Sequence, residues 1–232
     1  MNFLALVNRT RSECGVSAAA LASLTSLSSE DTRVKNWVAE AWHDLQLHKP
    51  DWEWMRKSFT FTTTASQQAY TATQASASDM ADWKRDTFRC YVTANGVSDE
   101  AILPFMDYTT FRDVYLFGTN RTQTGRPVAF TINPGNKNLL LGVIPDATGY
   151  TVDGDYFRNV TDLTADIDDP ASTANGLDVR WHMLIVYMAM EMYAAYEAAP
   201  EVAARAIAGK KRLMQRLEFD QLPMPTMGPP LA

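Results

Sequence analysis

The chain has 232 residues, of which 46% are hydrophobic and 21% are charged, a composition typical of a soluble globular protein with one sizeable core. Its formal net charge of -6 opposes tight binding to nucleic acid, because such binding depends on Lys and Arg displacing counterions from the phosphates. The longest apolar run, Met183 to Met190, is far shorter than the ~20 residues that cross a membrane, so no membrane contact is expected.

The first predicted element is an amphipathic helix over residues 31–47. Apolar residues recur there at offsets of three and four, which places them on one helical face: Val34, Trp37, Val38, Ala41, Trp42 and Leu45. Ser28 and Asp31 supply N-capping side chains, and Pro50 stops the helix. The preceding residues, 6–21, are interpreted only as a polar-to-apolar lead-in.

Two further tryptophans, Trp52 and Trp54, follow this helix closely. Large rings at a helix end either fill the core or occupy a pocket on a neighbouring subunit, and core packing is the favoured interpretation. A ligand pocket at this place is what a small-molecule-binding α+β domain would need.

From residue 57 to residue 157 the apolar period changes from about 3.6 to about 2, the pattern of half-buried antiparallel strands. The alternating apolar residues are Phe59 and Phe61; Phe88, Cys90 and Val92; Val128, Phe130 and Ile132; and Tyr150 and Val152. The Asn-Pro-Gly-Asn sequence at 133–136 leads into Leu139–Leu141 and predicts a hairpin. A helix capped by Asp107 and ended by Gly118 interrupts the strands.

Two stretches carry too few apolar groups to demand burial. Residues 65–82, rich in Ala, Ser, Thr and Gln, are predicted to form a long hairpin tip or surface excursion. Residues 160–178 are rich in Asp and contain Pro170 and Gly176, so we expect an acidic connector back to helical structure.

Four aspartates of that stretch form a candidate site: Asp162, Asp166, Asp168 and Asp169. They lack the D-x-D-x-D-G spacing and the distal Glu of a calcium loop, so a solvated acidic loop is favoured. A second hypothesis is that they line a passage through which DNA slides, since like charge raises the cost of contact at each phosphate.

The last predicted elements are two packed helices. Asp178 can cap the first, whose residues 183–190 are apolar on every side and therefore indicate the centre of a bundle. Pro200 suits the first turn of the second helix, whose apolar stripe should face the first in an antiparallel hairpin. The stripe consists of Val202, Ala206, Leu213 and Leu217.

Basic residues gather at the end of the last helix: Arg205, Lys210, Lys211, Arg212 and Arg216. They can stabilise the helix through its dipole or form a docking face for an acidic partner, and the sequence leaves both possibilities open. The proline-rich end that follows, LPMPTMGPPLA, is expected to be extended and to expose Leu222, Met224 and Met227.

Nothing in the sequence indicates catalysis or a cofactor. The phosphate-binding, nucleophile-elbow and zinc-protease motifs are absent from the sequence. Cys14 and Cys90 suit neither a disulfide framework nor a metal site. His43, His48 and His182 show no metal-ligand spacing, so a non-enzymatic protein without metal or cofactor is expected.

Taken in order, several segments resemble the head-to-tail adaptor (connector) proteins of tailed bacteriophages. They are LVNRTRSECGVS, WVAEAWHDLQ, DWEWM, FRCYV, ILPFMDYTTFRDVY, PVAFTI with the turn at Ile144 to Asp146, and VRWHMLIVYMAMEMYAAYEAAPEVAARA. The resemblance covers most of the chain, and its specificity comes from the order and spacing of the segments together.

The resemblance implies a structural virion protein at the head–tail interface, assembled in the bacterial cytoplasm as a homo-oligomeric ring, with a dodecamer favoured. Such a ring contacts the portal protein above and a tail or nozzle protein below, and DNA passes through it without specific binding. The part that engages the portal would be residues 210–232. The candidate docking residues are Lys210, Lys211, Arg212, Phe219, Leu222, Met224 and Met227. Another tail or baseplate ring component remains an alternative.

The predicted fold class is α+β: a helical bundle with an inserted antiparallel β region and an extended C-terminal tail. The expected domains are a helical bundle (1–56 and 178–219), a β-rich insertion (57–160), an acidic connector (161–177) and the tail (220–232).

Overall fold

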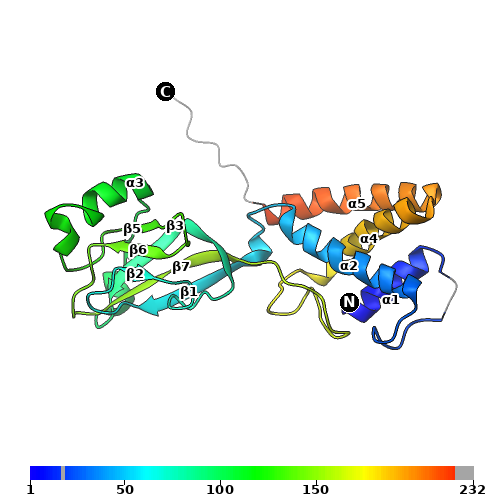
Figure 1. Cartoon of the computed structure of the whole chain (residues 1–232), viewed down its shortest axis with the longest axis horizontal. Coiled ribbons are helices and arrows are strands. Elements are labelled where there is room, and N and C mark those ends of the chain that lie inside the picture. Colours follow the sequence, from blue (N-terminus) through cyan, green and yellow to red (C-terminus); the bar gives the residue numbers. More distant parts are fainter. Residues whose placement is uncertain (17–18, 223–232) are drawn as a thin grey trace, which may run out of the picture. The chain divides into compact units, whose positions relative to one another are not determined.

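The computed structural model describes residues 1–16 and 19–222. The chain divides into two compact units, a helical unit made of Met1–Met55 with the residues from Val160 onward, and a β-rich unit made of Arg56–Asn159 (Figure 1). The mixture of helices and antiparallel sheets confirms the predicted α+β class.

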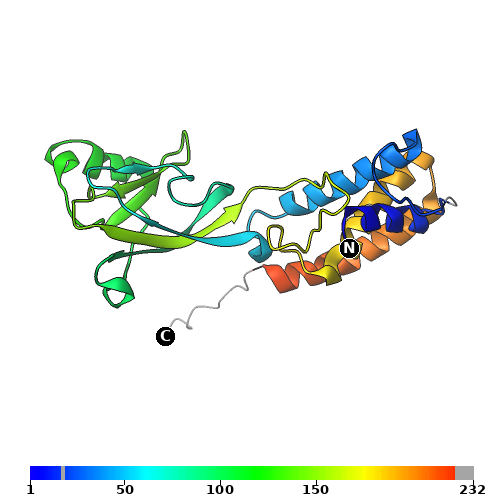
Figure 2. The same ribbon diagram turned by 90° about the horizontal axis from the view of Figure 1, so that it is seen from below.

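The helical unit is built from α1 (Phe3–Glu13), α2 (Ser29–Leu47), α4 (His182–Glu197) and α5 (Pro200–Gln221), with short 3₁₀ turns η1 (Glu53–Met55) and η5 (Val179–Trp181). Helix α4 lies between α2 and α5, as Figures 1 and 2 show from two directions. Leu184, Ile185 and Ala189 of α4 are fully buried, which confirms the prediction of a central helix.

Helix α1 corrects the interpretation of the N-terminal segment as a mere lead-in. The Asn2 side chain accepts a hydrogen bond from the Ala5 backbone N–H at 3.0 Å and so caps the helix. Phe3, Leu6 and Val7 are fully buried. These residues follow the i, i+3, i+4 pattern over only two turns, and the polar sequence that comes next concealed it.

The N-cap of α2 and the hairpin of α4 and α5 form as the sequence predicted. Ser28 caps α2 by accepting a hydrogen bond from the Asp31 N–H at 3.1 Å. Helix α4 ends at Glu197, its C-cap residue Ala198 has φ +51°, and Pro200 begins α5. The tail was predicted to begin at residue 220, but helix α5 continues to Gln221. Residues 223–232 of the predicted tail lie outside the described part of the chain.

The tryptophans at the end of α2 pack in the core, as favoured. Trp42 and Trp52 are fully buried, and the ring centroids of Trp42 and Trp54 are 5.5 Å apart. The Trp52 indole N–H donates to the Leu45 carbonyl at 3.0 Å, which satisfies the one polar atom of that ring.

The β-rich unit contains β1 (Arg56–Thr62), β2 (Ala69–Tyr70), β3 (Met80–Val92), β4 (Ala101–Ile102), β5 (Ala129–Ile132), β6 (Leu139–Gly142) and β7 (Tyr150–Arg158). One sheet has the order β1-β7-β3-β4 and the other β2-β6-β5, with antiparallel pairing throughout. The predicted hairpin is the β5–β6 pair, in which Ile132 lies opposite Leu139. Further elements are η2 (Gly96–Asp99), α3 (Tyr108–Phe111), the π-helical turn η3 (Arg112–Leu116) and η4 (Thr119–Thr122).

Aromatic rings fill the space between the two sheets. Phe88 of β3 stacks on Phe130 of β5 with centroids 3.9 Å apart, and Phe59 of β1 packs against Trp83 at 5.0 Å. Buried aromatic pairs of this kind contribute both area and specific geometry. The helix predicted after Asp107 is α3, and Asp107 caps it by accepting from the Thr109 N–H at 2.9 Å.

The prediction that residues 65–82 form a surface excursion was wrong. Tyr70 is 2% exposed, and Ala75 and Ala77 are fully buried in the core of the β-rich unit. The Tyr70 ring packs on Phe61 with centroids 4.8 Å apart. Small alanine side chains fit against the large rings, so the segment is buried despite its low hydrophobicity.

Candidate interaction surfaces

The described residues contain no group of three or more His, Cys, Asp or Glu side chains placed to hold a metal ion. Cys14 and Cys90 are free and buried. Burial raises the pKa of Cys14 to about 12 and that of Cys90 to about 11. Both thiols are therefore protonated near neutral pH and are poor nucleophiles.

The three histidines have separate environments. His182 is fully buried at the start of α4, and burial lowers its pKa below the usual value. Its Nδ1 lies 2.6 Å from the Met1 amino nitrogen, and its Nε2 lies 3.7 Å from the Asp169 carboxylate. His48 contacts Glu218 of α5 at 3.3 Å, and His43 is half-buried on α2.

Asp168, one of the candidate acidic residues, organises its own loop. Its carboxylate accepts hydrogen bonds from the Thr164 and Ala165 backbone N–H groups, each at 2.7 Å. These N–H donors hold the pKa of Asp168 below its usual value, because they stabilise the ionised form. The Asp168 backbone carbonyl also accepts from the Phe3 N–H of α1 at 2.7 Å.

Two further members of the acidic set also bind neighbouring parts of the helical unit. The Asp166 carboxylate accepts from the Leu24 N–H at 3.0 Å, and Asp169 accepts from the Ala171 N–H at 2.8 Å. Asp162 is exposed. Asp168 therefore holds the acidic stretch to α1 and Asp166 holds it to the loop before α2, whereas the Asp169 bond lies within the stretch itself.

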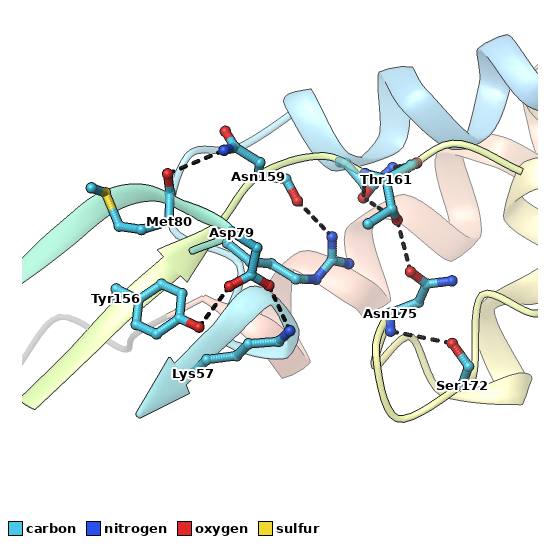
Figure 3. A network of polar contacts seen from close by, with 10 residues as sticks. Lys57, Asp79, Met80, Tyr156, Asn159, Thr161, Ser172 and Asn175 are labelled. Atoms are coloured by element: carbon cyan, nitrogen blue, oxygen red, sulfur yellow. Dashed lines mark hydrogen bonds and ion pairs between the residues drawn. The ribbon is translucent and has the colours of Figure 1, made fainter. Parts of the chain in front are cut away.

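A buried polar network fastens the same stretch to α2. Gln46 is 2% exposed, donates to the Thr161 carbonyl at 2.9 Å and accepts from the Thr161 N–H at 3.0 Å. The Thr161 hydroxyl donates to the Asn175 side-chain oxygen at 2.7 Å (Figure 3). Buried polar groups that are paired in this way fix one conformation of the segment.

The β-rich unit contains a comparable network around Asp79. Lys57 and Tyr156 point at the Asp79 carboxylate, each at 2.7 Å (Figure 3). Although burial works to raise it, the bonds from Lys57 and Tyr156 hold the pKa of Asp79 below its usual value. Burial and the neighbouring Asp79 raise the pKa of Tyr156. These groups satisfy one another, which is typical of a structural network.

The basic side chains near the end of α5 are only partly available to a binding partner. Lys210 forms an ion pair with Glu191 of α4 at 2.5 Å, whereas Lys211 and Arg212 are exposed. Phe219 is 75% exposed, which is unusual for a large aromatic side chain in a stable helix. Leu222 is half-buried; the candidate residues Met224 and Met227 lie outside the described part of the chain.

A surface groove runs along α4 and α5. One part, of about 590 Å³, is lined by Asp44 and His48 of α2, by Met188 and Glu191 of α4, and by Ile207, Lys210, Lys211, Met214 and Gln215 of α5. A second part, of about 610 Å³, is lined largely by alanines at the α4–α5 turn and shares Glu191 and Ile207 with the first. Open apolar grooves of this size on a helical bundle mark protein contacts.

The sequence was compared with models of known protein families. The model described as SU10 adaptor protein matches residues 1–227, almost the whole chain. The chain belongs to the SU10 adaptor protein family. A search of curated proteins found no match.

This family membership identifies a structural adaptor protein of a bacteriophage, and it confirms the resemblance drawn from the sequence. Such a protein is a component of the virion with a non-enzymatic role, and it interacts with portal and tail components. No helix within residues 1–16 and 19–222 is long and apolar enough to span a bilayer.

Proposed function

We propose that this adaptor forms a homo-oligomeric ring, most simply a dodecamer, between the portal and the tail or nozzle protein and keeps the DNA channel continuous. The observation that carries the proposal is the match to an adaptor family together with a helical hairpin that exposes apolar side chains on its outer surface. Phe219 and Ile207 of α5 are 75% and 56% exposed, and Ile207 lines the open groove. Exposed apolar groups on a charged helix are stabilised when a partner covers them.

The end of α5 and the residues after it dock on the portal in this proposal. The docking set is Lys210, Lys211, Arg212, Phe219, Leu222, Met224 and Met227. Exposure of Phe219 supports the assignment, and the Lys210–Glu191 pair makes Lys210 a structural member of the set. The sequence after α5 is rich in proline, and proline reduces the conformational entropy that a segment loses on binding, which favours its capture by a groove on the partner.

Co-sedimentation with purified portal tests the docking role. Deletion of residues 223–232 combined with Phe219→Ala should abolish sedimentation with the portal and leave the melting temperature unchanged, because Phe219 contributes little to the core. Val97→Ala, at a side chain that is 74% exposed on the β-rich unit, is the matched control and should sediment normally. Undiminished sedimentation of the truncated variant would contradict the docking role.

The β-rich unit contacts the tail or nozzle protein in this arrangement. Arg126 pairs with Asp99 at 3.1 Å and thereby joins the segments that carry three exposed apolar side chains. These are Val97, Ile102 and Val128 at 74%, 68% and 52% exposure. Exposed apolar side chains on segments that an ion pair holds together are suitable for a protein interface.

The acidic set of Asp162, Asp166, Asp168 and Asp169 lines the DNA channel in the proposed ring. Carboxylates there would let DNA pass without specific binding, since they repel phosphates. Asp162→Lys tests this, because Asp162 has no role in the loop hydrogen bonds described above. Assembled particles with this variant should eject DNA more slowly than wild type; an unchanged ejection rate would count against the lining role. Assembly in the host cytoplasm belongs to the same proposal.

A further inference from the structure

The edge strands of the β-rich unit differ in length and in how they are covered. Strands β2 and β4 have two residues each, and β5 is covered because Phe130 bonds through its backbone to Pro104 and Met106 at 3.0 and 2.8 Å. Strand β1 has seven residues and lies at the edge of its sheet (Figure 1). Within the described residues, only β7 is hydrogen-bonded to the backbone of this strand.

The pairing with β7 shows which backbone groups of β1 face outward. Just past the end of β1, the Thr63 N–H donates to the Tyr150 carbonyl at 2.7 Å. Hydrogen-bonded pairs alternate with non-bonded pairs in an antiparallel ladder, so Phe61 and Phe59 also bond to β7 and the residues between them do not. The N–H and C=O groups that point away from the sheet belong to Ser58, Thr60 and Thr62.

Strand β1 lacks the features that normally protect an edge strand. Its register with β7 has no bulge, whereas β3 has two register shifts. Its charged residues are Arg56 and Lys57, and both pair within the same unit, with Asp155 at 2.5 Å and Asp79 at 2.7 Å. Residues 58–62 include neither proline nor a charged residue. An edge of this kind pairs readily with a further strand.

The side chains of β1 define what such a further strand must carry. Phe59 and Phe61 face the core and are 4% and 7% exposed, and Thr60 and Thr62 are exposed on the opposite face. Side chains that lie opposite each other in neighbouring strands share a face of the sheet. The added strand therefore needs apolar residues beside the two rings and polar residues beside the two threonines.

The polar face beside β1 favours a cation on the added strand. An open pocket of about 280 Å³ lies on this face, and its lining includes Ser58, Arg89, Glu100, Asp153 and Asp155. Asp153 lies opposite Thr60, and Arg89 pairs with Glu100 at 3.6 Å instead of with Asp153. Burial and the neighbouring Glu100 raise the pKa of Asp153, so a nearby cation would stabilise its ionised form. Neighbouring strands lie about 4.8 Å apart, so a Lys or Arg on the added strand would start about two spacings from Asp153 and could reach it.

The described part of this chain offers no strand that could cover β1 in a ring. Strands β2 and β4 are too short, and β5 is already covered. Pairing of β1 with β1 of a second copy needs a two-fold axis, which a head-to-tail ring does not have. The proposed function places the tail or nozzle protein against a set that includes Ile102 of β4. Strand β1 is three spacings, about 15 Å, from β4 in the same sheet, so one partner can reach both.

We infer that an extended segment of the tail or nozzle protein adds to the outer side of β1, pairs with the backbone of Ser58, Thr60 and Thr62, and carries a cation toward Asp153. The inference rests on the proposed function, which places that protein against the β-rich unit. In strand additions of this kind the main-chain hydrogen bonds supply affinity, and the alternate side chains supply specificity.

Two substitutions of one residue separate backbone recognition from side-chain recognition. Thr60→Pro removes an outward N–H and no bond to β7, and proline is tolerated at such edge positions. Thr60→Ala is the matched control, because it keeps the N–H. Each variant is assembled on the portal, and attachment of the purified tail or nozzle protein is measured by sedimentation. Thr60→Pro should weaken attachment about tenfold or more, whereas Thr60→Ala should attach like wild type.

Hydrogen exchange of the wild-type chain tests the same edge without a substitution, and it decides the question if Thr60→Pro melts far below wild type. On the portal alone, the amides of Ser58, Thr60 and Thr62 should exchange fast, because no acceptor within the described residues holds them. Attachment of the tail or nozzle protein should protect them.

The cation is tested separately. Asp153→Asn should weaken attachment several-fold and reduce its dependence on salt, since one charge pair is lost. Asp113→Asn, at an exposed carboxylate elsewhere in the β-rich unit, is the matched control and should change neither. Unchanged attachment of Asp153→Asn would overturn the assignment of the cation.

The outcomes separate this inference from the proposed function. Equal attachment to a folded Thr60→Pro variant and to Thr60→Ala, or attachment that leaves the three amides unprotected, would overturn the inference and leave the proposed function standing. Protection of these amides on the portal alone would show that another copy or the portal covers β1, and would overturn the inference as well. Failure of the tail or nozzle protein to attach to wild type would overturn both proposals.

Discussion

The two units of this adaptor differ in whether their surface cations form ion pairs within the same unit. In the β-rich unit Arg56 pairs with Asp155 at 2.5 Å, and Arg126 pairs with Asp99, so the cations of the sheets have partners inside the same unit. In the helical unit the outer surface of α5 keeps Lys211, Arg212 and Arg216 unpaired. The comparison indicates that ion pairs stabilise the sheets from within the β-rich unit, whereas the three cations of α5 contribute no such pair to the described part of the helical unit.

The largest expected loss of stability comes from a substitution in the core of the helical unit. Ile185→Asp should lower the free energy of unfolding by at least about 3 kcal/mol, because Ile185 is fully buried in α4 and an unpaired carboxylate cannot be solvated there. Thermal unfolding followed by far-UV circular dichroism measures the loss. Ile167→Asp, the same change at a side chain that is 81% exposed, should stay within about 0.5 kcal/mol of wild type.

The next effect addresses the core of the β-rich unit. Phe130→Ala should cost about 3–5 kcal/mol, since it empties a fully buried site that stacks on Phe88. Phe117→Ala should cost less than about 1 kcal/mol, because that ring is 48% exposed. Equilibrium unfolding in urea compares the two, and equal losses would show that the stacked pair is not central to the core.

Two glycines with nearly equal φ angles, one in each unit, sharpen the comparison. Gly176 has φ +82°, and an added Cβ would lie 2.7 Å from the Trp54 carbonyl oxygen; Gly149 has φ +81° and open space around it. Gly149→Ala should cost about 1–2 kcal/mol from the left-handed conformation alone. Gly176→Ala should cost at least about 1 kcal/mol more, because the clash is with backbone and cannot be relieved by a rotamer change. Equal melting temperatures would contradict the tight packing of the acidic stretch.

The sequence predicted the elements whose patterns are local. The all-round apolar residues of α4, Pro200 at the start of α5 and the 133–136 turn each carry their own structural reason. Burial of Ala75 could not be predicted, since an alanine enters a core only because distant rings leave room for it. The partners at the interaction surfaces were hidden in the same way, because the Lys210–Glu191 pair appears only once the register of two helices is known.

The smallest expected effect concerns acid sensitivity of the helical unit. The folded-state pKa of Asp168 is lowered by the Ala165 and Thr164 N–H groups, so its contribution to stability is present above its unfolded pKa of about 4 and is lost as the pH falls through the folded value. Asp168→Asn should therefore lower the melting temperature slightly at pH 7 and flatten its decline on acidification below about pH 4. The Asp162→Asn variant, at an exposed carboxylate of the same stretch, should keep the wild-type decline. If both variants decline alike, the hydrogen bonds that the Asp168 carboxylate accepts from Thr164 and Ala165 do not contribute to the acid sensitivity of the helical unit.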